Sequence, residues 1–377
     1  MRVTQINLQP HFGGGEVYTA FLTHALARLG IATRLFVHPR ATFWPTLGLP
    51  TDTELVPAAT IDAVADALSD PAGWLIGHGP LPRAFVGEAK AHHALVTAIA
   101  HMPVQGRDPS AFADHDRVFP VSGWVLSGLR EAGLPAWDEP LYGVANLQRA
   151  ASGGAIRRAS RYDWDRRKFR DRVLSWLEPM VEPWRPHPSY EKRPGLTLGI
   201  VSRLTPIKQF PLLFECLSPA LARHASVNIE IFGSGGYASV RDMTSALAPI
   251  AGRVRFWGHQ SDVAAIYRGI DYLLTGLPEK EALGLNVIEA QACGTPVLAP
   301  NALPFTETVV DGVTGFLYRD PRTDGGEDFD RLLGKLTALP APPDPHQATD
   351  HLAKFSLDAF VERLKPIVAW AETEIAA

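Results

Sequence analysis

The sequence predicts an α/β protein made of two doubly wound domains, each with a parallel sheet. Three observations support this fold class. Short apolar or β-branched runs alternate with segments of helical spacing, which is the pattern of strands joined by crossover helices. The alternation starts near the N-terminus and restarts after residue 195. The chain has 377 residues, more than a single compact core usually holds.

In the first half, residues 2–8 are expected to form a strand and residues 16–29 a helix that ends at Gly30. The glycine run Gly13-Gly14-Gly15 lies between them. Further strands of this half are expected at 31–37, 74–76, 95–100 and 118–121. Strands of the second half are expected at 196–201, 227–232, 254–257, 272–275 and 296–299, with a helix at 211–221.

These elements give a plan of the domains. Residues 1–146 and 195–355 are expected to form the two domains. Residues 147–194 should be a linker with one helical insert, because the segment contains paired glycines and a proline-rich stretch. Residues 356–377 should form a terminal helix, and in two-lobed folds such a helix can cross back to the first domain.

Composition narrows the classes of function. Apolar residues make up 46% of the chain and charged residues 20%, which is ordinary for a globular protein. The formal net charge is -4, whereas nucleic-acid binders are usually basic, so no nucleic-acid partner is expected. Cys216 and Cys293 form no C-x-x-C pair, which fits a reducing cytoplasm. No apolar run reaches about 18 residues, so no membrane-spanning helix is expected, whereas peripheral membrane contact stays open.

The most informative stretch contains two glutamates eight residues apart. Glu281 lies in the loop after a predicted strand, and Glu289 lies in the second turn of a helix expected between Gly284 and Gly294. Ligands of open α/β sheets bind at this carboxyl edge, and free N–H groups at a helix start attract anions. Two carboxylates around such N–H groups would suit the hydroxyls and phosphates of a nucleotide sugar. A solvated loop residue and a wet helix face are the alternatives.

Two cations follow the first strand of the second half. Arg203 and Lys208 should project at the same sheet edge as Glu281, where they would hold phosphate. A pair of surface cations is the alternative. After the next strand, Gly233 and Gly235 would let the backbone approach a nucleotide closely, although an ordinary turn explains them equally. Trp257 would wall a base pocket or lie in the core.

Together these residues resemble the retaining glycosyltransferases of the glycosyltransferase 4 group. Their GT-B fold has two Rossmann-like domains that face each other across a cleft. The resemblance rests on Arg203 to Lys208, on Gly233-Ser-Gly235, on the Glu281 to Glu289 element with Cys-Gly-Thr-Pro-Val after it, and on residues 307–317. Residues 13–16 and 116–122 resemble the family too, and the likeness covers most of the chain except about 147–195.

The resemblance implies roles in a C-terminal donor domain. Glu289 would bind the ribose hydroxyls and Glu281 the sugar hydroxyls, while Arg203 and Lys208 would hold the diphosphate. Glu279 competes with Glu281, but only Glu281 keeps the eight-residue separation from Glu289. The backbone N–H groups near the sugar would be those of Ala282, Leu283, Gly284 and Leu285.

The N-terminal half would bind the acceptor. From this domain, Gly14 and Gly15 would close on the phosphates, and His101 matches a histidine near the reacting sugar carbon. His78 occupies a similar strand end, where we favour a structural or merely exposed residue.

By resemblance, the reaction moves a sugar from a nucleoside diphosphate to an acceptor hydroxyl with retention of configuration. The nucleotide would most often be UDP or GDP. The acceptor would be a carbohydrate or a lipid-linked carbohydrate in bacterial surface-polysaccharide or lipopolysaccharide assembly. No cofactor and no metal are expected, because Arg203 and Lys208 would neutralise the leaving group. A nucleotide-sugar epimerase, a phosphorylase of the same fold and a non-catalytic nucleotide-sugar-binding subunit remain as alternatives.

The segment 157–176 is rich in cations and aromatic residues. It would meet an anionic lipid or a lipid-diphosphate acceptor, or it would be a solvated helix whose apolar side chains pack on a domain. We favour packing for Trp164, Phe169, Val173 and Trp176, because three aspartates dilute the positive charge.

Overall fold

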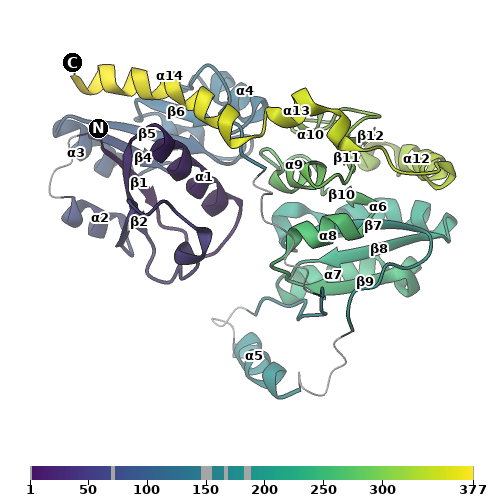
Figure 1. Cartoon of the computed structure of the whole chain (residues 1–377). Coiled ribbons are helices and arrows are strands. Elements are labelled where there is room, and N and C mark those ends of the chain that lie inside the picture. Colours follow the sequence, from purple (N-terminus) through teal and green to yellow (C-terminus); the bar gives the residue numbers. More distant parts are fainter. Residues whose placement is uncertain (1, 69–72, 146–154, 165–168, 182–187, 377) are drawn as a thin grey trace. The chain divides into compact units, whose positions relative to one another are not determined.

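The chain divides into two compact units in a computed structural model. One unit comprises Met1–Ala145 with Ala353–Ala377, and the other comprises Asn146–Leu352. The structure describes residues 2–68, 73–145, 155–164, 169–181 and 188–376. Each unit contains a six-stranded sheet whose neighbouring strands run parallel (Figure 1). The predicted class, two doubly wound α/β domains, is confirmed.

The sheet of the first unit has the strand order β3-β2-β1-β4-β5-β6. Its strands are β1 Arg2–Asn7, β2 Ala32–Val37, β3 Glu54–Pro57, β4 Gly73–Gly77, β5 Ala94–Ala100 and β6 Arg117–Pro120. Its helices are α1 Gly14–Arg28, α2 Ile61–Ala67, α3 Arg83–Ala91, α4 Gly123–Glu131 and α14 Leu357–Ala376. The terminal helix α14 packs against α1 and β5 within this unit (Figure 1).

The sheet of the second unit has the order β12-β11-β10-β7-β8-β9. Its strands are β7 Leu196–Val201, β8 Val227–Phe232, β9 Val254–Gly258, β10 Tyr272–Leu274, β11 Val297–Pro300 and β12 Gly315–Tyr318. Its helices are α5 Phe169–Val181, α6 Phe210–Arg223, α7 Tyr237–Ala246, α8 Val263–Gly269, α9 Leu285–Ala292, α10 Phe305–Thr308, α11 Pro321–Asp324 and α12 Glu327–Ala338. Helix α13, Thr349–Ala353, follows at the boundary between the units.

Both sheets repeat one topology. In each, the first strand of the unit is central, the next two strands extend to one side, and the last three extend to the other. The strand order therefore reverses between β1 and β4 in the first unit, and between β7 and β10 in the second. Ligands of doubly wound sheets bind beyond the carboxyl ends of the strands at such a reversal. We therefore expect functional side chains at these two edges.

Local sequence explains most element boundaries. Helix α1 ends as predicted, because Gly30 adopts a left-handed conformation with φ of 75°. The helix begins at Gly14, two residues before the expected start at Glu16. Strands β3 and β12 were not among the predicted strands. Both have only four residues. β3 is largely exposed, whereas β12 is apolar but short.

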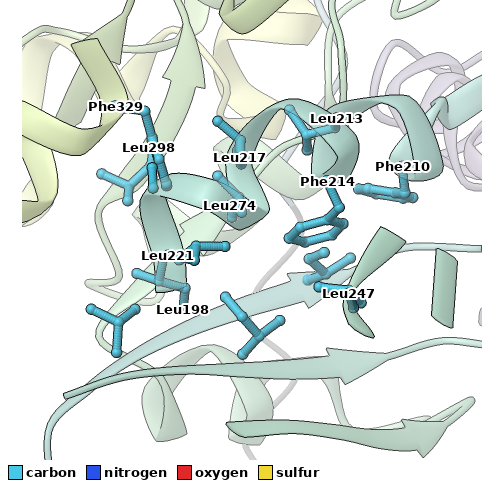
Figure 2. Close-up of a cluster of buried hydrophobic side chains, with 14 of the residues drawn as sticks. Leu198, Phe210, Leu213, Phe214, Leu217, Leu221, Leu247, Leu274, Leu298 and Phe329 are labelled. Carbon is cyan, nitrogen blue, oxygen red and sulfur yellow. The ribbon is translucent and has the colours of Figure 1, made fainter. Parts of the chain in front are cut away.

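The core of the second unit forms where α6 covers the sheet. Leu213, Phe214, Leu217 and Leu221 recur at helical spacing and face Leu198 of β7 (Figure 2). All five side chains are fully buried. Each contributes roughly 1.5–3 kcal/mol relative to an exposed side chain. This packing holds β7 in place beneath the loop that carries Arg203 and Lys208.

The insert departs from expectation at helix α5. We favoured packing of its apolar side chains on a domain, and for three of them this is wrong. Phe169 is 73% exposed, Trp176 67% and Val173 39%. Helical spacing places them with Leu177 on one face, and that face is open to solvent. Trp164 does pack, since its ring stacks on Tyr162 at a centroid distance of 4.7 Å.

Candidate functional site

The loops after β7 and β10 meet at the strand reversal of the second unit. The loop after β7 contains a 3-10 turn, Pro206–Lys208, and the loop after β10 contains Gly276. A Cβ atom on Gly276 would lie 2.6 Å from the backbone oxygen of Lys208, closer than real Cβ contacts come. Glycine is thus required at position 276 for the two loops to approach each other, and Gly276 was not among the predicted site residues.

Lys208 and Glu281 form an ion pair between these loops. Their side chains are 30% and 17% exposed, so the pair is partly screened from water and still accessible. The backbone fixes both ends. The N–H of Lys208 donates to the oxygen of Thr205 at 3.0 Å, and that of Glu281 donates to Pro278 at 3.0 Å. Two of the predicted site residues are therefore in direct contact.

Arg203 lies on the same loop as Lys208 and is exposed. Within the described ranges, its guanidinium has no protein partner. Glu279, the competitor for the role of Glu281, pairs instead with Arg322, which also binds Asp320. The geometry thus leaves Glu281 as the glutamate that faces Lys208.

Helix α9 begins beside this ion pair. Gly284 precedes it with φ of 83°, a left-handed conformation that other residues adopt with strain. Ala282 and Leu283 bury their side chains, so this segment offers mainly backbone groups. Four consecutive N–H groups have no acceptor in the part of the chain that the structure describes. They belong to Ala282, Leu283, Gly284 and Leu285.

Glu289 is oriented by a neighbour that the sequence did not reveal. The hydroxyl of Tyr267, on α8, donates to Oε2 of Glu289 at 3.1 Å. Burial, together with the Glu289 charge, raises the pKa of Tyr267 well above its usual value, so the phenol stays a donor. The side-chain amide of Asn286 donates to the oxygen of Val201 at 3.2 Å, which ties α9 to the end of β7.

The corresponding edge of the first unit carries no ion pair between its predicted residues. Gly13 caps α1, and Gly14 and Gly15 form its first turn. A Cβ atom on Gly15 would meet nothing within 4 Å, so the chain itself does not require glycine there. Glu16 behind them is buried, and the Asn7 amide lies 3.4 Å from its Oε1.

His101 contacts His78 at this edge. Nδ1 of His78 lies 3.0 Å from Nε2 of His101. The two rings stack with their centroids 5.3 Å apart and an interplanar angle of 13°. Burial lowers the pKa of His101 to about 4. Burial and the neighbouring His101 lower the pKa of His78 well below its usual value. Both rings are therefore neutral near pH 7, and His78 is a structural partner rather than merely exposed.

Comparison with known proteins shows which proteins the chain is similar to. Residues 195–333 match the model described as "Glycosyl transferases group 1". The D-inositol 3-phosphate glycosyltransferase of Frankia alni is 28% identical over 362 residues, which cover 85% of this chain and 86% of that protein. The same enzyme of Rhodococcus opacus is 34% identical over 152 residues, 37% of this chain and only 33% of that protein.

A solved structure matches almost the whole chain. The Anabaena protein HepE, in complex with UDP and glucose, superposes with a TM-score of 0.67 at 16% identity. The match covers 98% of this chain and 99% of that protein. The chain resembles the GT-B glycosyltransferases, and its fold is GT-B.

In this GT-B chain, Gly233 and Gly235 bring two loops of the second unit together. A Cβ atom on Gly233 would lie 1.9 Å from the oxygen of Ser202, and one on Gly235 would lie 2.1 Å from that of Leu204. The N–H of Leu204 donates to the oxygen of Ser234 at 2.8 Å. The glycines thus let the loop after β8 hold the Arg203 loop, which is a structural reason for them that needs no nucleotide.

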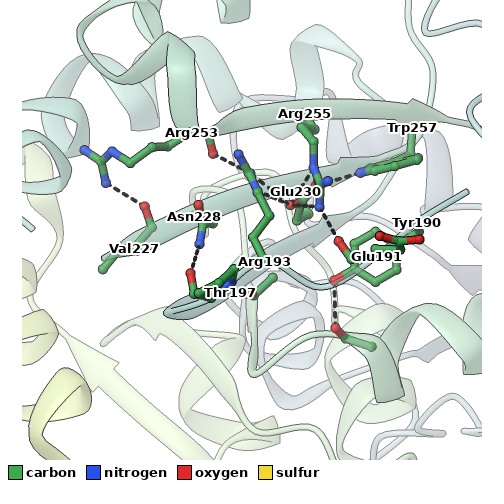
Figure 3. A network of polar contacts seen from close by, with 12 residues as sticks. Tyr190, Glu191, Arg193, Thr197, Val227, Asn228, Glu230, Arg253, Arg255 and Trp257 are labelled. Atoms are coloured by element: carbon green, nitrogen blue, oxygen red, sulfur yellow. Dashed lines mark hydrogen bonds and ion pairs between the residues drawn. The ribbon is translucent and has the colours of Figure 1, made fainter. Parts of the chain in front are cut away.

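Trp257 belongs to the core of the second unit and not to the wall of a base pocket. It is 1% exposed, and its Nε1 donates to Oε2 of Glu230 at 2.6 Å. Glu230 is fully buried in β8, where the sequence predicts only an apolar strand. Arg193 and Arg255 also donate to this carboxylate, at 2.9 Å and 2.6 Å (Figure 3). The network anchors the segment before β7 across β8 and β9.

Proposed function

We propose that this protein transfers a sugar from a nucleoside diphosphate to an acceptor hydroxyl, with retention of configuration. One observation carries the proposal. At the strand reversal of the second unit, Lys208 and Glu281 pair beside four N–H groups at the start of α9 that have no acceptor among the described residues. Cations and N–H groups suit a diphosphate, and carboxylates suit sugar hydroxyls.

The chemistry follows from where charge develops. When the bond between the anomeric carbon and the diphosphate oxygen breaks, negative charge grows on the diphosphate. Lys208, Arg203 and the N–H groups before α9 would stabilise that charge without a metal ion. A diphosphate that takes Lys208 away from Glu281 would free the carboxylate to accept hydrogen bonds from the sugar. Glu289 would hold the ribose.

Retention fits a front-face reaction. The acceptor hydroxyl would attack from the side on which the diphosphate leaves, and its proton would pass to a departing diphosphate oxygen. Bond formation to the acceptor oxygen and bond cleavage from the diphosphate balance with the donor and the acceptor as the only reactants. In this assignment Glu281 accepts hydrogen bonds from the sugar hydroxyls and is not the attacking nucleophile.

We propose UDP as the first donor nucleotide to test and GDP as the second, since HepE was solved with UDP. UDP-, GDP- and ADP-sugars would be compared by thermal shift and then by release of free nucleotide. Release that needs an acceptor supports transfer. Release without an acceptor, or conversion of the donor sugar alone, would favour a phosphorylase or an epimerase. Binding without turnover of any donor would favour a non-catalytic subunit.

Two acceptor classes deserve the test. The names of the relatives favour a cyclitol phosphate such as D-inositol 3-phosphate. A carbohydrate or lipid-linked carbohydrate of surface-polysaccharide or lipopolysaccharide assembly is the acceptor expected from the sequence. Mass spectrometry of the product would separate them, because only the first yields a glycosylated inositol phosphate.

We also propose peripheral contact of α5 with an anionic membrane on the cytoplasmic side. Residues 157–172 contain eight Lys or Arg and three Asp, in a chain whose formal net charge is -4. Phe169, Val173, Trp176 and Leu177 add an exposed apolar face. Such a combination binds anionic lipid surfaces. Across the described residues, every helix is too short or too polar to traverse a bilayer.

Sedimentation with vesicles of anionic lipid at low salt tests this contact. Trp176→Glu should lower the bound fraction, whereas Leu339→Glu, at another exposed apolar residue, should not. Equal binding of all three proteins, or no binding of the wild type at low salt, would overturn it.

A further inference from the structure

A one-directional chain of hydrogen bonds runs through the interior of the first unit to His101. It starts at Thr23 of α1, whose hydroxyl donates to the backbone oxygen of Thr19 at 2.8 Å. A hydroxyl has one proton, so this oxygen can only accept from its other neighbour. That neighbour is Nε2 of Gln5, at 2.9 Å. Thr23 and Gln5 are both fully buried, so water does not compete for these bonds.

The orientation of Gln5 sets the proton of His78. With its amide nitrogen facing Thr23, Gln5 presents its carbonyl oxygen to Nε2 of His78 at 2.8 Å. A carbonyl oxygen cannot donate, so the proton of neutral His78 must sit on Nε2. Nδ1 of His78 is then an acceptor. The hydroxyl of Thr19 lies 3.0 Å from Nδ1 and also 2.9 Å from the oxygen of Gly15, to which it donates.

His78 in turn sets the proton of His101. Nδ1 of His78 and Nε2 of His101 are 3.0 Å apart, and two facing lone pairs at that distance would repel each other. His101 must therefore donate from Nε2, which leaves its Nδ1 without a proton. In the described ranges no protein donor reaches this Nδ1. The rings of Tyr18 and His101 pack edge to face with their centroids 4.9 Å apart, which limits the rotation of the His101 ring.

We propose that Gln5 and His78 are positioning residues that hold His101 in the Nε2–H tautomer, so that its Nδ1 accepts a hydrogen bond from a substrate hydroxyl. The substrate part of this inference rests on the proposed function. In this state Nδ1 of His101 accepts a hydrogen bond from the hydroxyl, and His101 does not protonate the leaving group. Burial keeps both rings neutral near pH 7, which makes the tautomer the property that matters.

The matched variants Thr23→Val and Thr23→Ser test the chain at its far end. Valine has nearly the shape of threonine but cannot accept from Gln5, so the amide of Gln5 can turn and His78 loses its fixed tautomer. Serine keeps the hydroxyl. Thr23 lies three hydrogen bonds from His101, and neither variant changes a residue assigned to substrate binding.

Two readouts apply to the full-length protein labelled with ¹⁵N-histidine. Long-range ¹H–¹⁵N spectra at pH 7 distinguish the two tautomers, and loss of a signal in His101→Asn identifies His101. The wild type and Thr23→Ser should show the Nε2–H form, and Thr23→Val a mixture. Thr23→Val should also lower kcat/KM by about two- to tenfold, the effect of one hydrogen bond, with unchanged affinity for the nucleotide.

An Nδ1–H form of His101 in the wild type would overturn the inference. Identical spectra of Thr23→Val and Thr23→Ser would overturn it too. A merely structural role would change stability and leave the tautomer alone. If the spectra follow expectation but no donor is turned over, the proposed function fails, and the assignment of His101 as a substrate acceptor fails with it, while the tautomer control stands.

Discussion

The two sheets share one strand order, yet the edges at their strand reversals differ in chemistry. In the first unit the two histidines at the edge, His78 and His101, are held uncharged by burial in a network of amides and hydroxyls. In the second unit the edge is ionic, with the Lys208–Glu281 pair and the exposed Arg203. The comparison teaches that topology fixes where a site forms, while side chains decide which ligand chemistry it suits.

This difference matches the proposed division of labour. A diphosphate gains charge during the reaction, so cations placed in advance lower the barrier. Hydroxyl groups stay neutral, and a protein recognises them through hydrogen bonds whose donor and acceptor are fixed. Four measurements test this difference between the two units.

The ionic character of the second unit extends into its core at Glu230. Glu230→Ala should lower the free energy of unfolding of this unit by about 3–5 kcal/mol, because it leaves Arg193, Arg255 and the indole of Trp257 without their buried partner. Hydrogen exchange with mass spectrometry, in peptides from each unit, would measure this. Peptides of the first unit should change little, and Glu372→Ala, at an exposed site, is the control. Equal loss in both units would break the comparison.

Removal of the paired cation should affect catalysis rather than folding. Lys208→Ala is expected to lower kcat by about 10²–10³, the usual effect of losing a group that stabilises developing charge. Steady-state kinetics with the best donor would measure it. Lys280→Ala, at an exposed lysine one residue before Glu281, is the matched control. Activity of Lys208→Ala within threefold of wild type would refute the assigned role.

The carboxylate on α9 should matter for binding. Glu289→Ala is expected to weaken nucleotide affinity by roughly 1.5–3 kcal/mol, the contribution of a hydrogen bond to a charged group. Tyr267→Phe removes only the hydroxyl that orients Glu289, so a smaller loss of about 0.5–1.5 kcal/mol is expected. Isothermal titration calorimetry measures both. An unchanged dissociation constant for Glu289→Ala would contradict its role.

The neutral state of His101 in the first unit should appear as a pH effect on stability. The folded pKa of His101 is about 4, below the usual value of about 6.5 for an unfolded histidine. The unfolded chain therefore binds the proton first, so stability is fully present above pH 6.5 and is lost as pH falls towards 4. The slope for one histidine is at most about 1.4 kcal/mol per pH unit. Urea unfolding should show a shallower slope for His101→Asn, and an equal slope would argue against a neutral buried ring.

Some of these features could be predicted from the sequence and others could not. The E-x7-E spacing placed Glu281 in a loop and Glu289 on a helix, because glycine and proline mark the ends of that helix. Tyr267 gave no such signal, since a tyrosine at helical spacing looks like any core residue. Glu230 was hidden in an apolar strand, because its partners Arg193 and Arg255 lie far away in sequence. The short edge strand β3 lacked a pattern to find.

By itself, the sequence determined the α/β class, the two doubly wound sheets and the loops that carry Arg203, Lys208 and Glu281. Those features follow from local periodicity and from glycine and proline, whose conformational limits act within a few residues. Only the tertiary structure decided that Lys208 meets Glu281, that Trp257 is a core residue and that His78 faces His101. These are contacts between distant segments, and direct contact, burial and hydrogen-bond direction exist only once the chain has packed.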